Sequence, residues 1–104
     1  MVRVVIGVSA DRITGFSVRG HALGGEHGQD LICAGTSSIV FGAMNALDEM
    51  FPGQTDFKVG KDSVQIRTSS TDPKLQGCLR MLQFQLQTLA DDYPKNIQVK
   101  KKEV

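Results

Sequence analysis

Near the N-terminal end of the chain, a histidine and a cysteine flank a glycine-rich segment. His21 precedes this segment and Cys33 follows it, with Gly24, Gly25 and Gly28 between them. An imidazole close to a thiol can take its proton, and the resulting thiolate is a nucleophile at neutral pH. The imidazole can later return the proton to the leaving group. The residue types and their order therefore favour nucleophilic catalysis by a Cys-His pair.

The position of Cys33 indicates how its thiol would be activated. Asp30, three residues earlier, is typical of a helix N-cap, because its carboxylate can accept hydrogen bonds from the amides two and three residues on. Cys33 would then lie in the first turn, where the helix dipole and unbonded N–H groups lower the pKa of a cysteine from its usual value of about 8.5. The amides around Cys33, or those of the glycine-rich segment, could hold a developing oxyanion.

Each of these residues also has an ordinary structural interpretation. Cys33 could be a buried helix residue, and His21 a strand-end residue bonded to backbone. Asp30 could accept a hydrogen bond from His21, but a carboxylate near the thiolate would oppose its activation, so we favour the cap. Ser37, one turn after Cys33, either bonds back to the carbonyl of Cys33 or orients a catalytic group or substrate. Cys78 is expected in the core.

A metal site is the rival interpretation of the same segment. Four possible ligands, His21, His27, Asp30 and Cys33, lie close together in the chain, but they match no standard zinc spacing. We therefore expect no metal and no cofactor.

The composition predicts one globular domain. The 104 residues are 40% apolar and 22% charged, an ordinary balance for a single domain over residues 1–104. Twelve Lys and Arg against eleven Asp and Glu give a net charge of +1, which provides no long-range field to attract nucleic acid or an anionic membrane. Gly25–Gly28 formally fits the G-x-x-G clamp of KH domains, but that clamp needs basic residues where Glu26 stands. We expect no direct nucleic-acid binding.

The cysteine count and the hydropathy pattern point to the cytoplasm. Two cysteines without C-x-x-C spacing are typical of thiols in a reducing compartment rather than of a disulfide framework. No apolar run reaches about 18 residues, the length of a membrane helix. The N-terminus alternates like a strand and has no signal-peptide cleavage site. We expect a cytoplasmic protein that does not contact membranes.

Hydrophobic periodicity and turn residues predict the secondary structure. In chain order the elements are strands at residues 2–9 and 13–20, a helix from the N-cap Asp30 to about Met50, strands at 55–59 and 63–67, a helix capped by Asp72 with Pro73 at its first position, and a strand at 96–103. This ββαββαβ order predicts an α+β fold in which two helices pack on a largely antiparallel sheet.

These elements carry further predictions. The helix that ends near Met50 is apolar nearly all round, so we expect one face on the sheet and the other on a second copy, in a homodimer. Lys100–Lys102 suit an exposed edge strand. Residues 22–29 bury few apolar side chains, so we expect them to be mobile until substrate binds. The second helix has one apolar face, formed by Leu75, Leu79, Leu82, Leu86 and Leu89.

Gly20–Ala22 form the motif G-H-A, and Asp30–Ser37 read D-L-I-C-A-G-T-S. These two motifs resemble those of the ribosomal-processing cysteine protease family called Prp. That family has a G-H-A element, which Gly20–Ala22 match, and then a glycine-containing loop. Its next element is D-(I/L)-(V/I)-C-A-(A/G)-x-S, which Asp30–Ser37 match. The resemblance extends over the whole chain in length and element order.

The resemblance implies an activity and the residues that perform it. His21 and Cys33 match the catalytic pair of the family, and Asp30 and Ser37 match motif positions beside it. The family removes a short N-terminal extension from large-subunit ribosomal protein twenty-seven. The resemblance also implies a homodimer, and it implies no cofactor. The N-terminal segment of that ribosomal protein is therefore the expected partner. The supporting or substrate-binding residues expected on this basis are Gly20, Gly24, Gly28, Asp30 and Ser37.

Two functions of other classes stay open. The chain could be a non-catalytic ribosome-assembly binding protein that uses the same groove, or an oligomeric scaffold. A thiol-reactive probe separates the classes, because a protease is expected to label faster at Cys33 than at Cys78, whereas a scaffold leaves both thiols unreactive.

Overall fold

The structure is a computed structural model that describes residues 1–20 and 30–104. The predicted ββαββαβ order is confirmed, and each predicted boundary lies within one residue of the observed one, which is the usual uncertainty of element ends. In chain order the elements are β1 (Val2–Ser9), β2 (Arg12–Arg19), α1 (Asp30–Met50), β3 (Asp56–Val59), β4 (Ser63–Arg67), α2 (Pro73–Asp92) and β5 (Ile97–Glu103).

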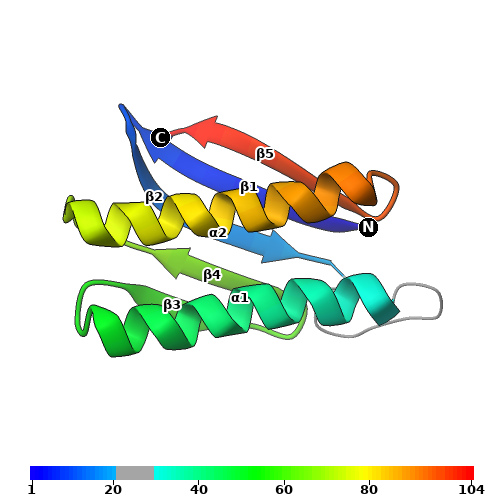
Figure 1. Cartoon of the computed structure of the whole chain (residues 1–104), viewed down its shortest axis with the longest axis horizontal. Coiled ribbons are helices and arrows are strands. Elements are labelled where there is room, and N and C mark those ends of the chain that lie inside the picture. The colour runs from blue at the N-terminus through cyan, green and yellow to red at the C-terminus, as the bar shows by residue number, and fades with distance from the viewer. Residues whose placement is uncertain (21–29) are drawn as a thin grey trace.

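The five strands form one mixed sheet in the order β3-β4-β2-β1-β5 (Figure 1). All neighbouring strands are antiparallel except β1 and β5, which run parallel. The parallel pair follows from the connection, because α2 carries the chain back along the sheet between β4 and β5. The prediction of a largely antiparallel sheet is therefore confirmed, and Lys100–Lys102 lie on the edge strand β5 as expected.

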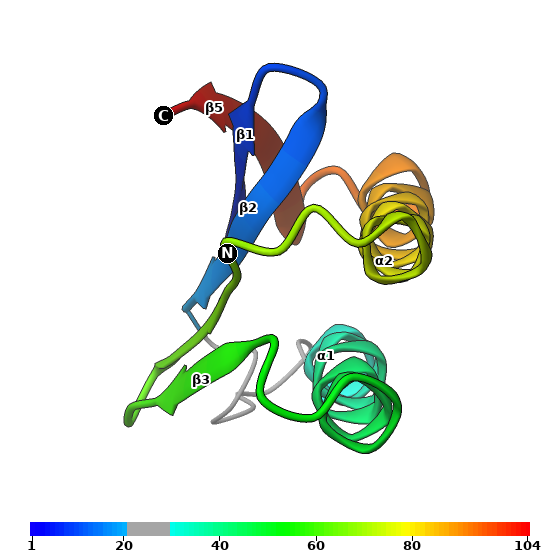
Figure 2. The ribbon, with the colours of Figure 1, turned by 90° about the vertical axis from the view of Figure 1, so that its left-hand side faces the viewer.

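Both helices cover the same side of the sheet, as the end-on view in Figure 2 shows. The core lies between the two layers, because alternate residues of each strand point to the helices. Its sheet side is formed by Val2, Val4, Ile6, Ile13, Phe16, Val18, Val64, Ile66 and Ile97. Within residues 1–20 and 30–104, no helix covers the opposite side of the sheet.

Helix α2 begins as the sequence predicts. The Asp72 side chain accepts a hydrogen bond from the Lys74 amide at 2.9 Å, and Pro73 occupies the first turn, where it lacks only an N–H that would be unbonded anyway. The apolar face differs at its last position. Leu89 is only half-buried, and Ala90 takes the final buried place after Leu75, Leu79, Leu82 and Leu86.

Helix α1 does not meet the expectation that no apolar run reaches the length of a membrane helix. Over Leu31–Met50 its mean hydropathy is 1.3, so among the described residues it is long and apolar enough to cross a membrane by length and composition alone. Core helices of soluble proteins meet the same criterion. Here α1 packs against α2 and its residues Val40 and Leu47 lie in the core, but only 28% of the apolar window is buried.

Candidate active site

Cys33 lies in the first turn of α1, as the sequence predicts. Its side chain is buried, with 4% of its surface exposed. The start of α1 and the end of β2 lie at the same end of the molecule (Figure 1). The amino end of a 21-residue helix therefore lies beside the thiol, and its aligned peptide dipoles carry about half a positive charge there.

Several of the predicted site residues lie outside the described part of the chain. These are His21, Gly24 and Gly28, with His27 of the rival metal set. Helix α1 begins at Asp30, which agrees within one residue with the helix start predicted from this residue. In residues 1–20 and 30–104, no group of three or more His, Cys, Asp or Glu side chains is placed to hold a metal ion.

Gly20 marks the point where the chain leaves β2 toward the site. Its φ of +108° is a conformation that residues with a side chain rarely adopt. A Cβ added here would lie 2.5 Å from the Met1 carbonyl oxygen, and the Gly20 amide donates to the Asp62 carbonyl at 3.1 Å. The backbone conformation at this position thus requires a glycine.

Gly20→Ala is expected to lower the free energy of unfolding by about 2 kcal/mol or more, since it combines a disfavoured φ with a backbone clash. Urea unfolding followed by circular dichroism measures the change. The matched control is Gly77→Ala, because Gly77 is helical and an added Cβ there meets no atom within 4 Å. Alanine is the better helix former, so this variant should gain up to about 1 kcal/mol. A Gly20→Ala protein as stable as the parent contradicts the geometry.

Two hydroxyl residues follow Cys33 on α1. Ser37, the residue that the sequence singles out, is half-buried one turn after Cys33. Thr36 was missed. It is fully buried, and its Oγ1 has no hydrogen-bond partner among the described residues, whereas Thr88 on α2 donates to the Phe84 carbonyl at 2.8 Å.

An unsatisfied buried hydroxyl costs about 1–3 kcal/mol, so its place one turn from Cys33 needs a reason. The signal in the sequence was a threonine three residues after the cysteine, on the buried stripe that Val40 continues. Thr36 therefore joins the residues that could serve the site.

Cys78 is not a fully buried core residue, contrary to the prediction. Its side chain is half-buried on α2 and lines two apolar depressions of about 690 and 510 Å3 on the helix layer, beside Met50 and Met81. The helix face turns Cys78 toward the surface because the core-facing stripe passes through Leu75 and Leu79 on either side of it. A thiol probe can therefore reach this cysteine as well.

These features define the class of protein first. The arrangement of two helices on one side of a five-stranded mixed sheet matches the solved structure of the ribosomal processing protease Prp from Staphylococcus aureus in complex with a substrate peptide. The TM-score is 0.87 at 31% sequence identity, covering 98% of this chain and 100% of the other. The same enzyme with a covalently linked product peptide matches with a TM-score of 0.85.

The sequence comparisons then give the particular family. The family profile "Cysteine protease Prp" matches residues 1–98. The ribosomal processing cysteine protease Prp of Bacillus subtilis is 35% identical over 107 residues, covering 95% of this chain and 96% of the relative. Its counterpart in Staphylococcus aureus is 30% identical over 103 residues, covering 95% and 97%. This chain belongs to the cysteine protease Prp family, and it is a cysteine-type peptidase.

Proposed function

We propose that this chain is a cytoplasmic endopeptidase that removes a short N-terminal extension from large-subunit ribosomal protein twenty-seven. Residues 1–104 would act as one catalytic domain, with Cys33 as nucleophile and His21 as its proton carrier. The observation that carries the proposal is the position of Cys33 in the first turn of α1, within a chain that matches the Prp family over residues 1–98.

The chemistry divides into two steps. The Cys33 thiolate attacks the carbonyl carbon of the scissile bond, and His21 gives a proton to the departing amine, which leaves a thioester between Cys33 and the N-terminal fragment. A water molecule then gives a proton to His21 and attacks the thioester, which releases a carboxylic acid and restores the thiol. That Prp from Staphylococcus aureus has been solved with a covalently linked product peptide supports a covalent intermediate in this family.

Other residues would support these steps. Amides at the start of α1 can donate to the oxyanion that forms during attack, and the helix dipole favours the negative charge there. We assign Gly20, Gly24, Gly28, Asp30 and Ser37 supporting or substrate-binding roles. Attack requires the sulfur to come within about 3–3.5 Å of the carbonyl carbon. Since Cys33 is only 4% exposed, the thiol must become accessible when the peptide binds.

A peptide assay tests the proposed function. A synthetic peptide that spans the N-terminal extension of the same organism's ribosomal protein is incubated with the protein and analysed by mass spectrometry. Hydrolysis of one bond, unchanged by a metal chelator, is the expected result, because the proposed mechanism uses no metal. Binding of the peptide without hydrolysis would instead support the non-catalytic ribosome-assembly binding protein. If the protein neither binds nor hydrolyses the peptide, both functions are excluded.

We propose that the protein forms a homodimer through its helix layer. Large apolar side chains remain exposed on the outer surface of both helices. On α1 they are Leu31, Phe41 and Met50, and on α2 they are Met81 and Phe84, with exposed fractions from 38% to 73%. A second copy that covers this surface would remove it from water, at a gain of about 25 cal/mol per Å2 of apolar area.

Phe84→Asp is therefore expected to shift the protein from dimer to the 11.3 kDa monomer at micromolar concentration, because Phe84 is 61% exposed on the outer side of α2. Sedimentation velocity measures the mass. The matched control is Val59→Asp, which introduces the same charge at a residue that is 56% exposed on the edge strand β3 rather than on a helix. A wild-type protein that sediments as a monomer, or a control that dissociates equally, would rule out a dimer through the helix layer.

A further inference from the structure

The side of the sheet that no helix covers carries most of the basic residues of the chain. We call it the open face; its side chains are those that alternate with the core positions along each strand (Figure 2). The pairing registers arrange them in three rows across the sheet. The rows are Gln98, Arg3, Arg19 and Ser63; then Lys100, Val5, Ser17, Gln65 and Lys58; then Lys102, Gly7, Gly15, Arg67 and Asp56.

Arg12 extends this array beyond the third row, since it pairs with Ser9 at the end of β1. With it, the described strand positions of the open face hold seven basic residues and one acidic residue, Asp56. The net charge of +1 thus hides a strong separation of charge, with about +6 on one side of the sheet.

Protection of sheet edges explains only part of this array. Lys58 on β3 and Lys100 and Lys102 on β5 lie on the two edge strands, where charge discourages pairing with other chains. Arg3 and Arg19 lie on β1 and β2, two of the three strands inside the sheet, and stand directly opposite each other. Like charges in such a cross-strand pair are destabilising. An anionic ligand on this face would remove that repulsion.

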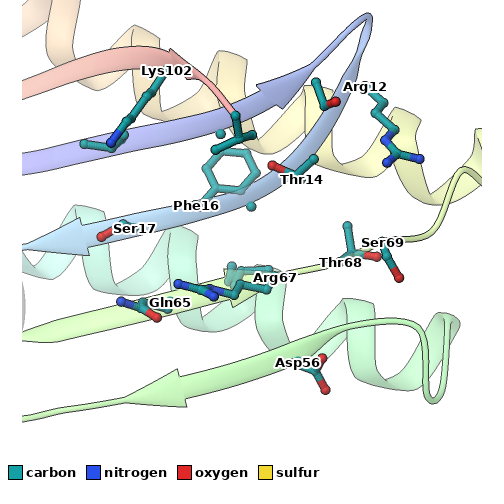
Figure 3. A pocket seen from close by; sticks show the side chains of 16 residues that line it. Arg12, Thr14, Phe16, Ser17, Asp56, Gln65, Arg67, Thr68, Ser69 and Lys102 are labelled. Atoms are coloured by element: carbon teal, nitrogen blue, oxygen red, sulfur yellow. The ribbon is translucent and has the colours of Figure 1, made fainter.

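The third row also forms a shallow depression. Gly7 and Gly15 are neighbours on adjacent strands, so the floor of this row is backbone, and the depression has a volume of about 620 Å3. Figure 3 shows Arg12, Arg67 and Lys102 around it. Arg67 and Lys102 lie three strands apart, or about 14 Å at the usual strand spacing of about 4.8 Å. The cationic side chains of Arg67 and Lys102 therefore border this depression.

We propose that the open face binds structured RNA through its sugar-phosphate backbone. A polyanion with regularly spaced phosphates matches a two-dimensional array of Lys and Arg and releases counterions on binding. The array also includes Ser17, Gln65 and Gln98, which can donate to phosphate oxygens and 2′-hydroxyls. None of the residues in the three rows is aromatic, so the face offers no stacking platform for unpaired bases.

The same observations disfavour other occupants. Two copies of this chain would not pair through the open face, because each would present about +6 to the other. Membrane surfaces are usually engaged with apolar side chains that enter the lipid. Val5, at 36% exposure, is the one large apolar side chain in the three rows. RNA binding does not depend on the proposed catalytic pair, although it would hold a ribosomal-protein processing enzyme close to ribosomal RNA.

The test compares two variants with identical changes in charge. The open-face variant is Lys58→Gln, Lys100→Gln and Lys102→Gln. The control variant is Lys74→Gln, Lys95→Gln and Lys101→Gln, which are also exposed but lie off the open face. Lys101 is the closest match, since it lies between Lys100 and Lys102 on β5 and points to the other side of the sheet. Each variant loses three lysines and passes from a net charge of +1 to −2.

Binding to a labelled RNA duplex of about 16 base pairs, the span of a double-stranded RNA-binding domain, is measured by fluorescence anisotropy from about 50 to 200 mM salt. The open-face variant should bind at least about tenfold more weakly than wild type, and the slope of log K against log salt should fall by about two to three. The control variant should change less than threefold.

Equal weakening of both variants, or no binding of the wild type at about 50 mM salt, would overturn the proposal. So would tighter binding to phosphatidylserine vesicles or to polyglutamate, which would assign the face to a membrane or an acidic protein. Hydrolysis of the short extension peptide is measured in parallel. Because neither variant changes a residue assigned to catalysis, both should match wild type, and a failure of RNA binding is thereby distinguished from a failure of the proposed peptidase function.

Discussion

Cys33→Ala is expected to lower kcat/KM for the extension peptide at least about a thousandfold, because no other group can form the thioester. The loss should fall on kcat, while the variant still binds the peptide, since the thiol is needed for bond formation rather than for recognition. Turnover is followed by mass spectrometry, and peptide binding by calorimetry. Retained turnover in a folded Cys33→Ala protein would exclude Cys33 as the nucleophile.

The chain supplies its own control for this experiment. Cys78→Ala removes the other thiol, which is half-buried on the helix layer rather than at the start of α1, and should leave turnover unchanged. Cys33→Ser keeps the volume of a side chain that is 96% buried, so it separates loss of the nucleophile from loss of packing. Both Cys33 variants should be inactive. If only the alanine variant loses activity, the effect of Cys33 is structural.

The burial of the two thiols changes what a labelling experiment can show. Cys78 is more exposed than Cys33, so a small thiol reagent can modify Cys78 first without any bearing on catalysis. Exposure and thiolate character both control reactivity. The informative reagent is therefore a peptide with an electrophile at the scissile position, because binding directs it to the catalytic cysteine. It should modify Cys33 and leave Cys78 unmodified.

Local patterns in the sequence predicted most of the fold. Alternation of apolar residues in Val2–Ser9 and the Asp72-Pro73 start of α2 are decided by neighbours in the chain, and both were predicted to the residue. The parallel pairing of β5 with β1 depends on where α2 delivers the chain, about ninety residues after β1 begins. Such long-range pairing leaves little local trace in the sequence.

The amino-acid composition did not reveal the separation of charge on the sheet, for a similar reason. Net charge averages over both sides of the sheet, whereas the open face depends on which residues share a side and on the order of the strands. Arg3 and Arg67 are far apart in the chain, yet they lie only two strands apart. The expectation of no nucleic-acid binding was therefore based on a quantity that does not report on this surface.

The parts of the candidate site that belong to a sequence motif were predictable, whereas the features that depend on tertiary packing were not. The motif around Cys33 placed the cysteine in the first turn of a helix, which the structure confirms. The near-complete burial of Cys33 and the unsatisfied hydroxyl of Thr36 depend on what packs against α1. His21 lies outside the described residues, so its role stays a prediction from the motif.

His21→Ala is expected to lower kcat about 10²–10⁴-fold, the usual contribution of general acid-base catalysis by one side chain. The reason is chemical: without the imidazole, nothing protonates the departing amine or takes the proton of the attacking water. The residual rate should exceed that of Cys33→Ala, because the thiol and the helix amides remain. Steady-state assays of the same extension peptide give the rates of both variants.

The chain has one other histidine, His27, and His27→Ala is the matched control that should keep full turnover. Added imidazole should restore part of the activity of His21→Ala, because the small molecule can occupy the space of the lost side chain and carry the proton. A purely structural histidine would not respond in this way. If imidazole restores nothing while the variant is folded and binds peptide, or if His27→Ala loses as much activity, the proton carrier is not His21. The pairing that the motif predicts would then have to be replaced by another base near the start of α1.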